Sequence, residues 1–122
     1  MNYLILIFIT LFLSCQNERL QKTEKKTFYY FCVSGAKDKI NQLNRKQILY
    51  TDVKEIVGEE SIINKKAVDW GNLVTRICKN KGGCTSDLNS YPSLSEAKYA
   101  FDETIHVYND TCKYYFKKVN FE

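Results

Sequence analysis

The chain has 122 residues, with 18 Lys and Arg against 14 Asp and Glu, which leaves a formal net charge of +4 at neutral pH. This length suits one small domain. The basic residues are scattered along the chain and do not form the tight stripe that is typical of nucleic-acid-binding proteins. We therefore expect a single domain and no nucleic-acid partner.

The first element is a short apolar segment. Residues 3–13 contain one polar side chain, Thr10, and they are followed by Ser14, Cys15 and a stretch of polar residues. A run of about 11 apolar residues is too short to span a bilayer, which needs about 20. It has the length of the apolar region of a secretory signal.

This segment resembles the signal of small bacterial lipoproteins, in which cleavage before a cysteine is followed by acylation. The resemblance covers residues 3–16, and it departs from the usual motif because Leu13 stands one place later than expected. It implies that residues 1–14 are removed and that Cys15 carries the lipid, palmitate included. The chain would then be anchored in the bacterial cell envelope, on the periplasmic side or the outer surface. An ordinary secretory signal with a coincidental cysteine is the alternative.

The region after the apolar segment is predicted to be a tether followed by two strands. Residues 15–27 are polar and rich in Lys and Glu, so we expect a flexible tether there and a single globular domain over 28–122. Aromatic and β-branched residues at 28–33 predict a buried strand, and alternating apolar residues predict a second strand over 47–57. Antiparallel pairing of the two strands is the simplest arrangement.

Two amphipathic helices are predicted next. Between residues 59 and 79, apolar side chains recur at steps of three and four residues, which places them on one helix face. These side chains belong to Ile63, Ala67, Trp70, Val74 and Ile77. After a loop over 81–92, Ser93 and Glu96 have the spacing of a capping box and predict the start of the second helix.

A last strand is predicted over 112–121, which completes the order β-β-α-α-β. This order predicts an α+β domain in which both helices pack on one face of a three-stranded, mainly antiparallel sheet. Such an arrangement would bury the apolar faces of both helices.

Four cysteines lie in the expected domain, and an even number in a small exported domain indicates two disulfides. Sequence alone leaves three pairings open. We favour Cys78–Cys84, because two glycines allow the short loop between them to turn, together with Cys32–Cys112, which would tie the first strand to the last. A structural zinc site is the alternative, but the spacing of Cys78 and Cys84 differs from that of a zinc knuckle. We expect neither a metal nor a cofactor.

The sequence contains no motif of a phosphate-binding loop, a zinc protease or a serine hydrolase. The single histidine, His106, has Asp102 and Glu103 nearby, but no local motif supplies a nucleophile. We therefore expect a protein without enzymatic activity.

Aromatic residues are concentrated on the predicted strands, and one sheet face would expose tyrosines if the helices covered only the other. Tyr29, Tyr50 and Tyr115 are therefore candidate binding residues, although a partly buried core would also explain them. We expect a membrane-tethered envelope lipoprotein that binds an envelope or extracellular protein, for example as an inhibitor or an immunity-type protein. The alternative is a small-ligand or glycan binder that uses the tyrosine-rich face.

Overall fold

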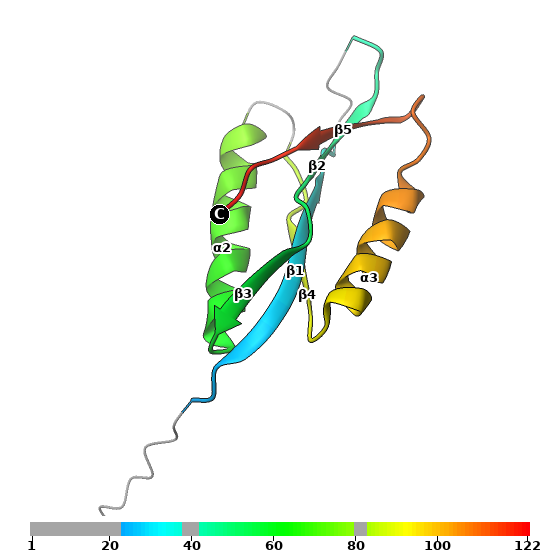
Figure 1. Cartoon of the computed structure of the whole chain (residues 1–122). Helices are drawn as coiled ribbons and strands as arrows, with labels where there is room; N and C mark the ends of the chain where they lie inside the picture. Colours follow the sequence, from blue (N-terminus) through cyan, green and yellow to red (C-terminus); the bar gives the residue numbers. More distant parts are fainter. Residues whose placement is uncertain (1–22, 38–41, 80–82) are drawn as a thin grey trace, which may run out of the picture.

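The computed structural model describes residues 23–37, 42–79 and 83–122 (Figure 1). The predicted signal segment, Cys15 and most of the predicted tether lie outside these residues. The elements are, in chain order, β1 (Lys26–Gly35), β2 (Lys46–Tyr50), β3 (Lys54–Gly58), α2 (Ser61–Ile77), β4 (Asp87–Tyr91), α3 (Leu94–Val107) and β5 (Tyr114–Lys118). The predicted mixture of helices and strands is confirmed.

β1 is the central strand of the sheet. It pairs antiparallel with β3 and then β2 along one edge, and with β4 along the other edge. β5 pairs in parallel with the far side of β2. The prediction of three strands is therefore wrong. The sequence 87–91 forms β4 although its mixed polar residues resemble a loop, because the free edge of β1 supplies the backbone partners.

The predicted second strand is split by a bulge between β2 and β3. Tyr50 lies opposite Val33 and Lys54 lies opposite Tyr30, so this side of the ladder contains one residue more than β1. Thr51 fills the break: its N–H donates to the Cys32 carbonyl, and its Oγ1 accepts the Cys32 N–H, both at 3.0 Å. The buried backbone therefore stays paired while the strand bends.

The two helices pack on opposite faces of the sheet, so the prediction that they share one face is wrong (Figure 1). Consecutive β1 residues are apolar, and because side chains alternate along a strand, both faces need a cover. The cluster beneath α2 consists of Tyr30, Cys32, Leu49, Trp70, Val74, Cys78 and Phe121. The cluster on the α3 side consists of Phe31, Val33 and Ile48, with Phe101 among the residues packed against it.

The helix predictions are largely confirmed. Trp70 and Val74 are the buried residues of α2, whereas Ala67 on the predicted apolar face is exposed. Ser93 caps α3: the Glu96 N–H donates to Ser93 Oγ at 3.3 Å, and the Ser93 hydroxyl donates to the Glu96 carboxylate at 2.8 Å. The capping box read from the sequence therefore forms.

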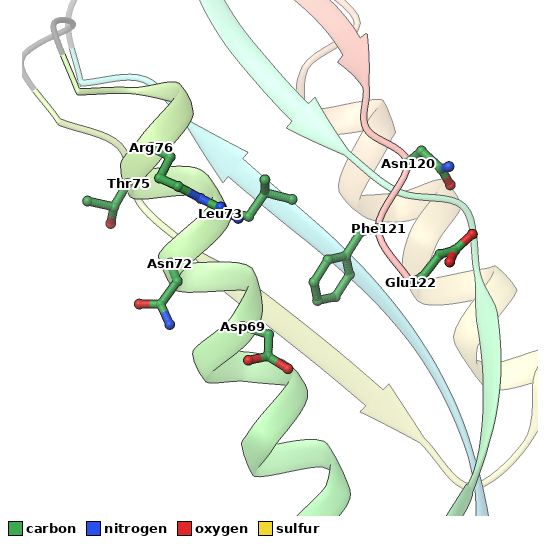
Figure 2. Close-up of a pocket in the computed structure, with 8 residues that line it drawn as sticks. All are labelled: Asp69, Asn72, Leu73, Thr75, Arg76, Asn120, Phe121 and Glu122. Atoms are coloured by element: carbon green, nitrogen blue, oxygen red, sulfur yellow. The ribbon is translucent and has the colours of Figure 1, made fainter.

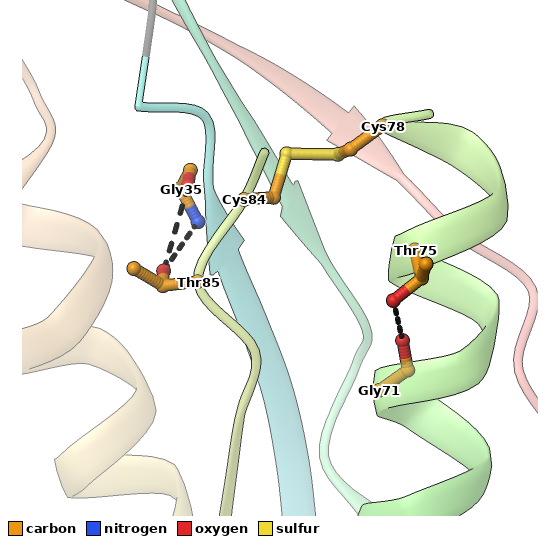
Figure 3. The surroundings of a disulfide bond; sticks show 6 residues. All are labelled: Gly35, Gly71, Thr75, Cys78, Cys84 and Thr85. Atoms are coloured by element: carbon orange, nitrogen blue, oxygen red, sulfur yellow. Dashed lines mark hydrogen bonds between the residues drawn. A yellow bond between two sulfur atoms is a disulfide. The ribbon is translucent and has the colours of Figure 1, made fainter. Parts of the chain in front are cut away.

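A disulfide joins the end of α2 to the segment that leads into β4 (Figure 3). The predicted Cys78–Cys84 bond is confirmed, with its Cα atoms 6.1 Å apart. Gly83 has a φ of 90°, a conformation that other residues rarely adopt, and it lets the chain turn back toward β1. There the Gly35 N–H donates to Thr85 Oγ1 at 3.0 Å. The bond therefore fixes the connection between α2 and the sheet.

The predicted Cys32–Cys112 disulfide is wrong. Cys32 is a buried free thiol in the middle of β1, and Cys112 is an exposed free thiol just before β5. β2 lies between β1 and β5, so the first and last strands are not neighbours. The prediction failed because it assumed that the terminal strands pair.

Candidate functional site

The three candidate tyrosines do not gather on one surface. Tyr50 belongs to the cluster on the α3 side, together with Tyr114. Tyr115 is the next residue of β5, so its side chain points to the opposite face, where Arg45 lies over its ring at 5.7 Å. Tyr29 is a cross-strand neighbour of Tyr91 on β4. Tyr29 and Tyr50 therefore lie on the α3 side of the sheet, and Tyr115 lies on the other side.

The aromatic residues instead form a continuous row on the α3 side of the sheet. The row runs from β4 to β5 and consists, in order, of the rings of Tyr91, Phe31, Phe101, Tyr50 and Phe116. The centroids of successive rings are 6.1, 5.4, 6.2 and 5.8 Å apart. Phe31 is fully buried, whereas Phe116 is 36% exposed. The row therefore passes through the buried ring of Phe31 and ends at a solvent-accessible ring on β5, Phe116, which the strand pattern alone does not distinguish from its neighbours.

β5 lies at the edge of the sheet, and among the described residues its one ring contact with the end of a helix is that of Tyr114 with Tyr108, whose ring centroids are 5.1 Å apart. Both α2 and α3 pack against β1 and β4, while β5 pairs only with β2. Lys118 forms an ion pair with Asp52 on the bulge, and this hydrogen bond raises the pKa of Lys118. Lys117 has no ion-pair partner among the residues that the structure describes. We call Tyr50, Asp52, Phe116, Lys117 and Lys118 the β5 surface.

A second feature is a groove of about 790 Å³ between α2 and the C-terminal residues (Figure 2). Leu73 and the ring of Phe121 supply its apolar surface. Its polar lining consists of Asp69, Asn72, Thr75, Arg76, Asn120 and Glu122. Of these only Thr75 has a side-chain partner among the described residues, the Gly71 carbonyl. The groove therefore offers unpaired groups of both charges.

Two buried titratable groups lie in the core cluster under α2. Burial raises the pKa of the Cys32 thiol to about 12, and the hydrogen bond with Thr51 offsets only part of that effect. Burial also raises the pKa of Tyr30, with a further contribution from the Cys32 charge. Both groups are therefore neutral at physiological pH, which suits core packing and disfavours nucleophilic chemistry at Cys32.

His106 is exposed near the end of α3, and its Nδ1 lies 3.4 Å from Nδ2 of Asn109. In the described part of the chain it forms no ion pair with Asp102 or Glu103. Residues 23–37, 42–79 and 83–122 contain no group of three or more His, Cys, Asp or Glu side chains placed to hold a metal ion. Within the same ranges, every helix is too short or too polar to cross a membrane.

No protein-family model, no curated protein and no solved structure matches this chain. The functional proposal for this molecule therefore rests on its own residues, chiefly the β5 surface and the Cys78–Cys84 disulfide.

Proposed function

We propose that this chain is a lipid-anchored protein of the bacterial cell envelope that binds another protein and has no enzymatic activity. Cys15 would become the N-terminal residue after removal of residues 1–14 and would carry the acyl chains. One acyl chain holds a protein to a bilayer only marginally, whereas two or more hold it firmly. The polar residues before β1, which begins at Lys26 and so shortens the tether expected over 15–27, would then connect the anchor to the domain.

Export is supported by the Cys78–Cys84 disulfide. Disulfides persist in oxidising compartments such as the bacterial periplasm, and they are rare in the cytosol. A domain of this size also has a small core, so one covalent link contributes a sizeable fraction of its stability.

Protein binding is supported above all by one observation, the exposed Phe116 ring on the edge strand β5. Aromatic rings with a polar or charged surrounding are enriched at protein interfaces, and Lys118, on the same face of β5 as Phe116, supplies that surrounding here together with Asp52. An inhibitor or immunity-type protein displayed on the envelope is one form that such a module takes.

A site-specific photo-crosslinker tests protein binding in cells. Placed at Phe116, it should yield one discrete protein adduct, whereas the same group at Tyr99, which is 70% exposed on α3, should not. Absence of any adduct at position 116, or the same set of adducts at both positions, contradicts the proposal. The Cys15→Ser variant tests the anchor, because it should release the chain from the membrane fraction.

A second candidate function is small-ligand or glycan binding. The groove beside α2 favours it, because the amides of Asn72 and Asn120 border an aromatic surface provided by Phe121. Titration with soluble envelope glycans, followed through the fluorescence of Trp70, which packs on Phe121, tests this alternative. A ligand that binds there should lose affinity in the Asn72→Ala variant.

A further inference from the structure

We propose that the partner adds an extended, acidic segment as a new strand to the free edge of β5. This inference rests on the proposed protein-binding function and specifies its site and the chemistry of the partner. Strand addition combines backbone hydrogen bonds, which give affinity, with alternate side-chain contacts, which give specificity.

The backbone of β5 has a definite orientation. The Lys113 carbonyl accepts the Lys46 N–H at 2.7 Å, and the Val119 N–H donates to the Tyr50 carbonyl at 2.8 Å. Because backbone groups alternate between the two edges of a strand, the odd-numbered residues of this segment face β2.

The even-numbered residues of β5 therefore direct their N–H and C=O groups to the outer edge. They are Tyr114, Phe116 and Lys118, and no described strand pairs with that edge. The Tyr114 N–H already donates to the Asp110 carbonyl at 3.0 Å, so Phe116 and Lys118 are the residues whose outward N–H and C=O groups an incoming strand could use. Phe116 combines an outward backbone with an exposed ring, so an incoming strand would gain hydrogen bonds and an aromatic contact at the same residue.

The charge of β5 selects the partner. Lys117 and Lys118 lie side by side on alternate faces of the strand, and only Lys118 has a described carboxylate partner, Asp52. Lysine on a sheet edge prevents unwanted pairing between strands. A second β5 would bring like charges together, whereas carboxylates on an incoming strand would face Lys117 on one side of the sheet.

The other open edges fit this partner less well. β3 contains both Lys54 and Glu55, and Lys54 already donates to the Phe121 carbonyl, so this strand offers an acidic segment no net positive charge. β4 has Asp87 as its only charged residue and is followed directly by Pro92. Of the described strands, β5 is therefore the one whose charge and exposed ring both suit an acidic, partly apolar segment.

The test uses the full-length chain in detergent, with its disulfide intact, and a synthetic peptide of sequence Glu-Val-Glu-Phe-Glu-Val-Glu. In an NMR titration, the peptide should shift the amide signals of β5, and its affinity should fall as salt is added. The same peptide with Lys in place of Glu should not bind. Methylation of one alternate set of peptide backbone nitrogens should abolish binding, and methylation of the other set should leave it intact.

Matched variants of the protein complete the experiment. Lys117→Glu should weaken peptide binding about fivefold or more, because it removes one exposed attractive charge pair and introduces one repulsive pair. Lys65→Glu on α2 should change the affinity less than about twofold. Equal effects of the two variants, or equal binding by both methylated peptides, overturn strand addition. Concentration-dependent self-association of the chain that disappears with Lys117→Glu would also overturn it, because a second copy would then occupy the edge through Glu55.

Because this titration needs neither the anchor nor the natural partner, its failure has a defined meaning. A negative titration together with an adduct at position 116 leaves protein binding in place and removes only the strand-addition mode. Absence of the adduct in cells removes the proposed function itself.

Discussion

The ring of Phe121 meets the ring of Trp70 edge to face, with centroids 5.4 Å apart, and thereby brings the C-terminal segment into the core beneath α2. Phe121 is 6% exposed and Trp70 is fully buried. Lys54 donates a hydrogen bond to the Phe121 carbonyl, and the Lys66 ammonium lies 5.3 Å from the ring centroid. These contacts attach the C-terminal residues to both β3 and α2.

Truncation of this ring should destabilise the domain. We expect Phe121→Ala to lower the free energy of unfolding by about 3 kcal/mol, because it removes a buried aromatic side chain and leaves a cavity against Trp70. Urea unfolding monitored by Trp70 fluorescence measures the change. Phe116→Ala is the matched control and should lower the free energy by about 1 kcal/mol, since that ring is partly exposed. Equal effects would show that Phe121 is not a core residue.

Removal of the disulfide should have a moderate effect on stability. The Cys78→Ser/Cys84→Ser double variant should lose about 2 kcal/mol of unfolding free energy, because the bond closes a short loop and restricts the unfolded chain only modestly. Denaturant titration of the oxidised protein and the double variant measures the difference. Cys112→Ser should leave stability unchanged, since Cys112 is an exposed free thiol.

The two free thiols should differ in reactivity. Cys112 should react with a maleimide in the native protein, and Cys32 should react only after unfolding, because it is buried and its protonated form is favoured. Mass spectrometry of protein labelled before and after denaturation counts the maleimide adducts and so shows which thiols have reacted. A native protein in which neither thiol can be labelled, even after unfolding without reductant, would instead indicate a Cys32–Cys112 disulfide.

Stability should fall at alkaline pH because of Cys32. Its pKa is about 12 in the fold, against 9.0 for the ordinary thiol, so between these values the folded state binds more protons than the unfolded state. The free energy of unfolding therefore decreases as pH rises through this window. Burial raises the pKa of Tyr30 in the same direction. When unfolding is measured at several pH values above 8, the free energy of unfolding should decrease less steeply with pH in the Cys32→Ala variant than in the wild type.

The α3 cap should contribute measurably to stability. Ser93→Ala removes the acceptor of the Glu96 N–H and should lower the free energy of unfolding by about 1 kcal/mol. Lys98→Ala, at an exposed position of α3 beyond the cap, should have less than half of that effect. Thermal unfolding followed by circular dichroism compares the two variants. A similar loss in both would mean that the capping hydrogen bond is not the source.

Local patterns predicted the elements whose signals lie within a few neighbouring residues. The Ser93–Glu96 spacing identified the start of α3, and the apolar steps around Trp70 identified the buried side of α2. The alternation of Ile48, Leu49 and Tyr50 between the two clusters also followed from the strand period. The Cys78–Cys84 bond belongs to the same group, because its loop is short.

Arrangements that depend on distant partners could not be read from the sequence. β4 is a strand because β1 offers it an edge, and its own residues do not show strand alternation. The bulge at Thr51 shifts Val53 to the α3 side, which simple alternation cannot anticipate. The candidate site depends on distant partners for the same reason: the exposure of Phe116 depends on which strands the helices cover, and the element order alone does not show that the helices lie on opposite faces.

The central position of β1 has a consequence for how the chain matures. Of the described strands, β1 is synthesised first, yet it can pair along one edge only after β2 and β3 are made and along the other only after β4 is made. Until residues 87–91 have emerged, the aromatic stretch 28–33 has no complete set of neighbours, and such stretches promote aggregation of nascent chains. We expect this protein to depend on a holding chaperone during its biogenesis, for as long as that stretch is unprotected.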